Sequence, residues 1–134
     1  MGFPTALQLY SVRGDMENDF YGTLKKVKDM GYDGVEFAGL FGEKAEDVKN
    51  ALSNLGLEPV SAHVPYYDML KDPNGVLADY KEIGCKYVAV PYLTEECRPG
   101  TDGFSDTVKG IRAIGEAAKK LGMTLLYHNH DFEF

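Results

Sequence analysis

The chain has 134 residues, of which 44% are hydrophobic, and it carries a formal net charge of −7. This length suits one domain with a sizeable core. The negative charge argues against nucleic acid as the main partner, because phosphate binding needs clustered lysines and arginines.

No run of 18 apolar residues occurs, which argues against a membrane span or a membrane partner. The N-terminus lacks the basic and then apolar layout of a signal peptide. Cys85 and Cys97 do not form a CxxC pair. We therefore expect a cytoplasmic protein with two reduced thiols, with a disulfide or a zinc site as the alternative.

A repeated pattern organises the chain. Four times, a segment with helical periodicity ends in an apolar residue followed by glycine, and a short apolar strand comes soon after. The glycines are Gly31, Gly56, Gly84 and Gly122. Glycine just beyond a helix end adopts the left-handed conformation that closes the last turn. The pattern therefore predicts successive strand–helix units.

The predicted elements alternate along the chain. Strands are expected at residues 6–12, 34–38, 59–64 and 87–92 and from residue 124. Helices are expected at residues 17–30 and 43–55, from the pair Asp72-Pro73, and at 105–121. Strands that alternate with helices through short connections indicate a parallel sheet covered by helices, in the α/β class.

Two parallel architectures fit such an alternation. A dinucleotide-binding sheet would have a GxGxxG loop after its first strand, and no such motif occurs. An eight-stranded (β/α) barrel takes about 250 residues, so five strands and four helices make a little over half of one. We predict that residues 1–134 form a single partial domain, the N-terminal part of a (β/α)8 TIM barrel.

Polar residues fall on one face of the predicted strands. Strand side chains alternate between the two faces, so the apolar sets would pack on helices and the polar sets would line the barrel interior. The polar set contains Glu36, His63 and the pair His128 and His130. In a barrel of this kind, function gathers at the carboxyl ends of the strands. We therefore expect these four residues to meet at one rim.

Each of these residues also has a plain structural explanation. Glu36 could be a surface carboxylate at a strand end, and His63 could be a core histidine bonded to the backbone. The pair His128 and His130 could likewise be structural, although two such histidines are hard to satisfy in a core. The string HNH is not read as a nuclease motif, since this acidic chain offers no basic surface for DNA.

Other candidate residues follow from their places near strand ends. Tyr10, Tyr66 and Tyr92 are predicted to stack on a sugar or to bond its hydroxyls, with ordinary half-buried tyrosines as the alternative. Glu133 follows the last strand as either a catalytic or a solvated carboxylate.

Several segments together resemble the sugar phosphate isomerase/epimerase family, within the xylose isomerase-like superfamily of TIM barrels. The segments are LQLYSVR (7–13), GYDGVEFAG (31–39), SAHVPY (61–66), GCKYVAVPY (84–92) and YHNHDFEF (127–134). The resemblance implies a barrel that binds a divalent metal ion (Mn, Mg, Zn or Co) and acts on a small-molecule sugar or sugar phosphate in carbohydrate metabolism.

The resemblance also suggests roles for individual residues. It implies isomerisation, epimerisation or dehydration through proton transfer next to a carbonyl. Glu36 and His63 match rim positions that face the substrate, and Glu133 is a further candidate base. The fifth strand of many family members supplies a metal-binding carboxylate, and here His128 and His130 are the predicted metal ligands in its place. The remaining ligands of the family come from later strands, so we expect an incomplete metal site in this chain.

A second hypothesis is structural. A half-barrel has two unpaired strand edges and an uncovered interior. Such a chain would self-associate as a homo-oligomer, and we expect it to have little or no catalytic activity on its own.

Overall fold

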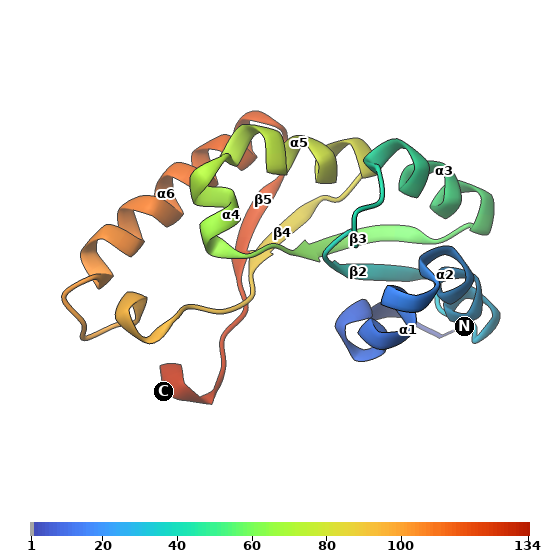
Figure 1. Ribbon diagram of the computed structural model, residues 1–134, viewed down its shortest axis with the longest axis horizontal. Helices are drawn as coiled ribbons and strands as arrows, with labels where there is room; N and C mark the ends of the chain where they lie inside the picture. The colour runs from blue at the N-terminus through green and yellow to red at the C-terminus, as the bar shows by residue number, and fades with distance from the viewer. Residues whose placement is uncertain (1) are drawn as a thin grey trace.

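The computed structural model describes residues 2–134. Its centre is one sheet of five parallel strands, which pair in the order of the sequence (Figure 1). The strands are β1 (Ala6–Gln8), β2 (Gly34–Ala38), β3 (Glu58–His63), β4 (Tyr87–Val90) and β5 (Thr124–Tyr127). A curved parallel sheet with this simple order is the N-terminal part of a TIM barrel, as predicted.

The helices lie on the outer side of this sheet and leave its inner side uncovered (Figure 1). They are α1 (Arg13–Asn18), α2 (Phe20–Asp29), α3 (Ala45–Leu55), α4 (Tyr66–Lys71), α5 (Pro73–Ile83) and α6 (Phe104–Lys120). Three short 3-10 segments, η1 (Leu9–Val12), η2 (Glu95–Cys97) and η3 (Asp131–Glu133), lie in the loops. Among residues 2–134, no helix is both long and apolar enough to cross a membrane.

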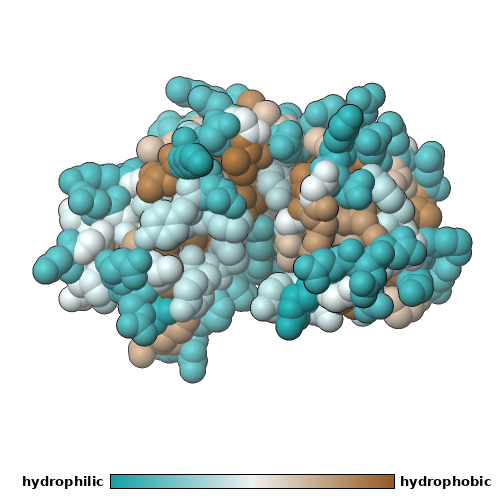
Figure 2. Space-filling model, viewed as in Figure 1, coloured by the Kyte–Doolittle hydropathy of each residue, from teal (hydrophilic) through white to brown (hydrophobic). Residues whose placement is uncertain are grey.

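The hydrophobic core lies between the sheet and the helices. Val35 and Phe37 of β2 are fully buried, and so are Leu24 and Val27 of the facing helix α2. These strand positions alternate with Glu36, which faces the other side. Figure 2 shows the molecular surface from the same side as Figure 1. Hydrophilic residues follow its outline, and hydrophobic residues gather between them. The helix-facing side of the sheet is therefore the core, and the inner side is free for polar side chains.

The first strand is shorter than predicted. The Gln8 side chain accepts a hydrogen bond from the Tyr10 backbone N–H at 2.9 Å, which caps η1 and ends the strand. The expected strand at residues 6–12 was therefore wrong after Gln8. Side-chain capping competes with the sheet ladder for the same backbone donors.

The number of helices was also underestimated, because four were expected and residues 2–134 form six. The helix expected at residues 17–30 is divided at Asp19, where the backbone has φ −153° and the side chain caps the Gly22 N–H. Helix α4 was missed because it spans only six residues and directly follows Pro65. The helix predicted to start at Asp72-Pro73 is confirmed, since Asp72 caps α5 through the Gly75 N–H at 3.0 Å.

The glycine pattern has the predicted cause. The four glycines of the repeat all have positive φ, between 66° and 107°. Gly84 shows the geometry most clearly, because it ends α5 with φ 107° and donates to the carbonyls of Tyr80 and Lys81. A side chain there would be strained, which explains glycine at this turn.

Candidate functional site

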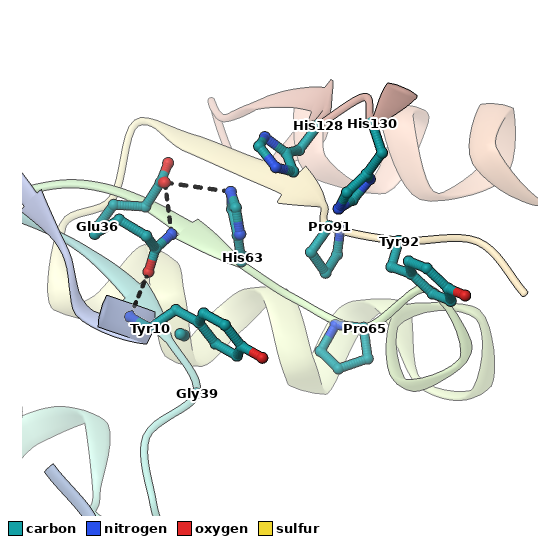
Figure 3. A pocket seen from close by; sticks show the side chains of 11 residues that line it. Tyr10, Glu36, Gly39, His63, Pro65, Pro91, Tyr92, His128 and His130 are labelled. Carbon is teal, nitrogen blue, oxygen red and sulfur yellow. Dashed lines mark hydrogen bonds and ion pairs between the residues drawn. The ribbon is translucent and has the colours of Figure 1, made fainter. Parts of the chain in front are cut away.

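A cavity of about 650 Å³ opens on the inner side of the sheet, at the carboxyl ends of the strands (Figure 3). We call it the main cavity. Its lining contains most of the polar residues that the sequence placed at the rim. The lining residues are Gln8, Tyr10, Glu36, Ala38, Gly39, His63, Pro65, Pro91, Tyr92, His128 and His130.

Strand register explains how one wall of the main cavity is built. Gln8 pairs with Glu36 across β1 and β2, and Glu36 pairs with Ser61 across β2 and β3. The register shifts between Val35 and Glu36, an irregularity of the bulge type that re-aims side chains next to it. The three polar side chains therefore lie side by side on neighbouring strands and face the interior.

Glu36 is the centre of a hydrogen-bond network on this wall. Gln8 Nε2 donates to Glu36 Oε1 at 2.6 Å, and the Ser61 hydroxyl donates to Glu36 Oε2. The Gln8 amide is itself oriented, because its oxygen accepts from the Tyr10 N–H. Both carboxylate oxygens thus have donors, although 28% of the Glu36 side chain remains exposed. A carboxylate held this way has one fixed orientation in the cavity.

His63 contacts the same carboxylate from the end of β3. Its Nε2 atom lies 3.2 Å from Glu36 Oε1, and 16% of its side chain is exposed. Burial lowers the pKa of His63; the Glu36 carboxylate raises it, and the neighbouring His128 and His130 lower it again, so that the net direction is downward. A histidine with a lowered pKa is a neutral imidazole at pH 7, which can accept a proton.

The two histidines that follow β5 complete the opposite wall. The His128 backbone N–H donates to the Val90 carbonyl at 3.0 Å, which continues the β4–β5 ladder beyond the strand. The ring centroids of His63 and His128 are 4.9 Å apart, and so are those of His128 and His130. Figure 3 shows Glu36 on one side of the cavity, His128 and His130 on the other, and His63 between them. The predicted convergence of these four residues is therefore present in the structure.

An aromatic stack fixes the ring of His130. Phe132 is stacked on it with centroids 5.0 Å apart and planes 9° apart, and Tyr92 meets it edge-on at 5.8 Å. The Arg98 guanidinium lies 3.6 Å from the Phe132 centroid and donates to the Tyr92 hydroxyl at 2.7 Å. Arg98 was not singled out in the sequence, because no pattern marks a loop arginine as the partner of a distant aromatic ring.

The three predicted tyrosines have different positions. Tyr10 and Tyr92 line the main cavity and are 57% and 49% exposed. Tyr66 does not line it, because its side chain is buried in α4 against α6. A Cβ built on Gly110 would lie 2.2 Å from the Tyr66 hydroxyl, which shows how closely the two helices approach. The structure thus brings two of the three tyrosines to the cavity.

Glu133 closes the C-terminal turn and does not line the cavity. Its carboxylate accepts hydrogen bonds from the Tyr127 hydroxyl and from the His130 backbone N–H. Desolvation raises the pKa of Glu133, but these two hydrogen bonds and the charges of His130 and Arg98 together outweigh it, so the net direction is downward. In this arrangement Glu133 acts on the cavity through the position of His130.

The donor set can be tested against a metal ion. Within residues 2–134, no three side chains of the ligand types lie close enough together to hold one. His128 and His130 offer two imidazoles, and structural or catalytic zinc sites use three or four protein ligands. These residues therefore do not make a complete metal site, and the chemistry proposed below uses side chains alone.

Two residues of the network were not predicted as site residues. The alternation of strand side chains puts Gln8 and Ser61 on the inner face, but neither was singled out for function. Strand alternation could have identified Ser61 as a site residue, because Ser61 lies on the same face of β3 as His63. For Gln8 the decisive contact depends on the register of β1 against β2, which the sequence does not specify.

The chain belongs to the xylose isomerase-like TIM barrel family, whose model matches residues 24–134. A crystal structure of a sugar phosphate isomerase/epimerase from Parabacteroides distasonis is similar over 99% of this chain and 57% of that chain, at 25% identity and a TM-score of 0.82. No match was found among curated proteins.

Two further solved structures share the fold. The 3-keto-D-glucoside 4-epimerase YcjR from E. coli matches over 81% of this chain and 50% of that chain, at 20% identity and a TM-score of 0.59. A family 2 AP endonuclease from Brucella melitensis matches over 93% and 55%, at 17% identity and a TM-score of 0.65. The chain thus spans about half the length of these three structures.

Proposed function

We propose that the main cavity is part of the active site of a sugar isomerase or epimerase, which moves a proton at the carbon next to a carbonyl. The observation that carries this proposal is the contact between Glu36 and His63 inside a cavity that also holds His128 and His130. The similarity to a sugar phosphate isomerase/epimerase supports a sugar or sugar phosphate as the substrate.

The proposed chemistry needs one base and one acid near the same carbon. Glu36 would take the proton from the carbon next to the carbonyl, and the electron pair left behind would form a carbon–carbon double bond. In its protonated form, His128 or His130 of the opposite wall would give a proton to the carbonyl oxygen, which yields an enediol and a neutral imidazole. Delivery of a proton to the opposite face of the same carbon gives the epimer, and the imidazole takes back the oxygen proton as the carbonyl re-forms. Delivery of a proton to the former carbonyl carbon gives the isomer, and the imidazole then takes the proton of the neighbouring hydroxyl group. General acid–base catalysis of this kind contributes about 10²–10⁴-fold in rate.

The network around Glu36 suits this role. Gln8 and Ser61 hold the carboxylate in one orientation, so no side-chain rearrangement is needed when the substrate binds. His63 is the residue through which Glu36 could exchange its proton, since the two side chains are already in contact. Glu133 is proposed to position His130 rather than to act as a base.

Proton exchange with solvent tests the proposal directly. The chain is incubated in D₂O with a panel of ketoses, aldoses and inososes, and deuterium at the carbon next to the carbonyl is followed by NMR. If the main cavity acts as an active site in this chain, exchange occurs with at least one sugar, and Glu36→Gln should slow it by about 100-fold or more. The matched control is Glu58→Gln, an exposed carboxylate at the amino end of β3. Equal exchange by Glu36→Gln and the unchanged chain would remove Glu36 from the mechanism, and no exchange with any sugar would refute the proposal for this chain.

Self-association is a second candidate property. Within the described residues, β1 and β5 each pair with one neighbouring strand, and Leu126 and Tyr127 of β5 are 43% and 38% exposed. Exposed strand edges of this kind pair with other chains. Native mass spectrometry with metal analysis of the same sample tests this point. A dimer without metal would favour a self-paired sheet, and one divalent ion per chain would support His128 and His130 as ligands, which stays a prediction.

A further inference from the structure

A second cavity adjoins the main cavity and has no role in the chemistry above. We call it the side cavity, and it also measures about 650 Å³. It lies between the start of α1 and the loop after β2. Tyr10 and Ala38 line both cavities, so a ligand that extends past Tyr10 from the main cavity enters the side cavity.

The side cavity offers both kinds of surface that a sugar ring requires. The rings of Tyr10 and Phe41 line it and are 57% and 38% exposed, and such rings supply flat apolar area. Arg13 provides N–H donors, while Asp15 and Glu17 provide acceptors. Sugar hydroxyl groups both donate and accept, so this mixture matches them.

The charges disfavour a phosphate group in the side cavity. Asp15 and Glu17 outnumber Arg13, and the Arg13 guanidinium is already engaged, 4.2 Å from the Tyr10 ring centroid and 2.9 Å from the Tyr10 carbonyl oxygen. An anion would therefore be repelled by two carboxylates, and the guanidinium that could attract it already contacts Tyr10. A neutral ligand avoids that repulsion.

Phe41 is held in an unusual conformation at this cavity. It is the one non-glycine residue with positive φ within residues 2–134, at 53°. Two residues after Phe41, the Glu43 carboxylate accepts a hydrogen bond from the Tyr21 hydroxyl at 2.8 Å. The ring centroids of Phe20 and Phe41 lie 6.2 Å apart. A bulky side chain in this region of backbone space is strained, and strain of this kind clusters at ligand-binding sites.

We infer that the side cavity is a subsite for a second, uncharged sugar unit, so that the substrate class is a glycoside or disaccharide rather than a free monosaccharide. Small-molecule pockets measure about 300–1,000 Å³, so each cavity has room for one ring. The inference rests on the proposed function, because it takes a sugar in the main cavity as given. In this arrangement Tyr10 separates the two units, and Phe41 contacts the outer one.

Backbone amide NMR titrations of the full chain test the subsite. The probes are glucose, glucose 6-phosphate and four disaccharides: cellobiose, maltose, lactose and trehalose. We expect at least one disaccharide to shift amides in both cavities, such as those of His63 and Gly14, and to bind about tenfold more tightly than glucose. Glucose should shift only amides of the main cavity.

Variants distinguish a loss of binding at the subsite from a general loss of fold stability. Phe41→Gly should reduce the affinity for the disaccharide to that for glucose and leave glucose binding unchanged. Phe3→Gly is the matched control, because Phe3 is 96% exposed and lines neither cavity. Phe41→Asn provides a second test if the glycine variant does not fold, since asparagine tolerates this backbone region.

Three results would overturn the inference. If glucose shifts the main cavity and no disaccharide shifts the side cavity, the subsite is refuted and the proposed function stands. If glucose 6-phosphate gives the largest shifts in the side cavity, the subsite binds phosphate instead. If none of the probes shifts either cavity, the subsite and a sugar in the main cavity are refuted together.

Discussion

Replacing Ser61 with alanine tests whether the network around Glu36 also stabilises the fold. Ser61 is 5% exposed, and its hydroxyl donates to Glu36 Oε2. A hydrogen bond to a charged group contributes about 1.5–3 kcal/mol. Glu36 is 28% exposed, so water replaces part of the lost bond in the variant. We therefore expect Ser61→Ala to lower the free energy of unfolding by about 1–2 kcal/mol.

Urea denaturation followed by circular dichroism measures this change. For a slope of about 2 kcal/mol/M, the midpoint should fall by about 0.5–1 M. Ser53→Ala is the matched control, because Ser53 lies exposed on α3. Alanine is the better helix former by up to about 0.7 kcal/mol, so the control should be as stable as the unchanged chain or slightly more stable.

A double-mutant cycle with Glu36→Met assigns the effect to the pair. Residues in one hydrogen-bond network show coupling energies of about 0.5–3 kcal/mol. If the two substitutions are additive within about 0.3 kcal/mol, or if Ser61→Ala is as stable as Ser53→Ala, the Ser61–Glu36 bond does not stabilise the fold and our account of the wall is incorrect.

Two further outcomes follow from close packing and from burial. On α6, Gly110→Ala should destabilise the fold by about 1–3 kcal/mol, because its Cβ would lie 2.2 Å from the Tyr66 hydroxyl. Gly115→Ala on the same helix should stabilise the fold by up to about 1 kcal/mol, since the nearest atom to the added Cβ lies 3.8 Å away. Thermal denaturation compares the two variants, and equal effects on stability would contradict the packing described. Burial, with a smaller effect of the Glu36 carboxylate, raises the pKa of the Cys85 thiol to about 12, whereas the hydrogen bond with the Tyr67 hydroxyl lowers the pKa of Cys97. Iodoacetamide at pH 8 should therefore label Cys97 before Cys85 in the folded chain, as read by peptide mass spectrometry, and the opposite order would contradict these environments.

Much of the fold could be predicted because its signals are local. The glycines that end helices, the Asp72-Pro73 start of α5 and the alternation of Val35, Glu36 and Phe37 each depend on residues close in sequence. The sheet and its parallel direction follow from the repetition of these signals. The errors also have local causes, since the caps formed by Gln8 and Asp19 interrupt apolar patterns that otherwise read as continuous.

The candidate site could be predicted only in part, because its geometry depends on contacts between strands. Alternation placed Glu36, His63 and His128 on one face, and the parallel order brought them together. The partners of Glu36 depend on register and on the shift next to Val35, which no local pattern encodes. Tyr66 shows the reverse case, since it follows a strand but begins a helix that turns its ring into the core.

The strand order also has a consequence for synthesis. Because the order along the sheet is the order along the chain, each new strand pairs with the strand made just before it and does not wait for a later segment. Glu36 can therefore meet His63 soon after β3 is made. At about 5–20 residues per second, His128 follows several seconds later. During that interval the Glu36–His63 pair would lie on an open wall, and His128 and then His130 would add the opposite wall of the main cavity.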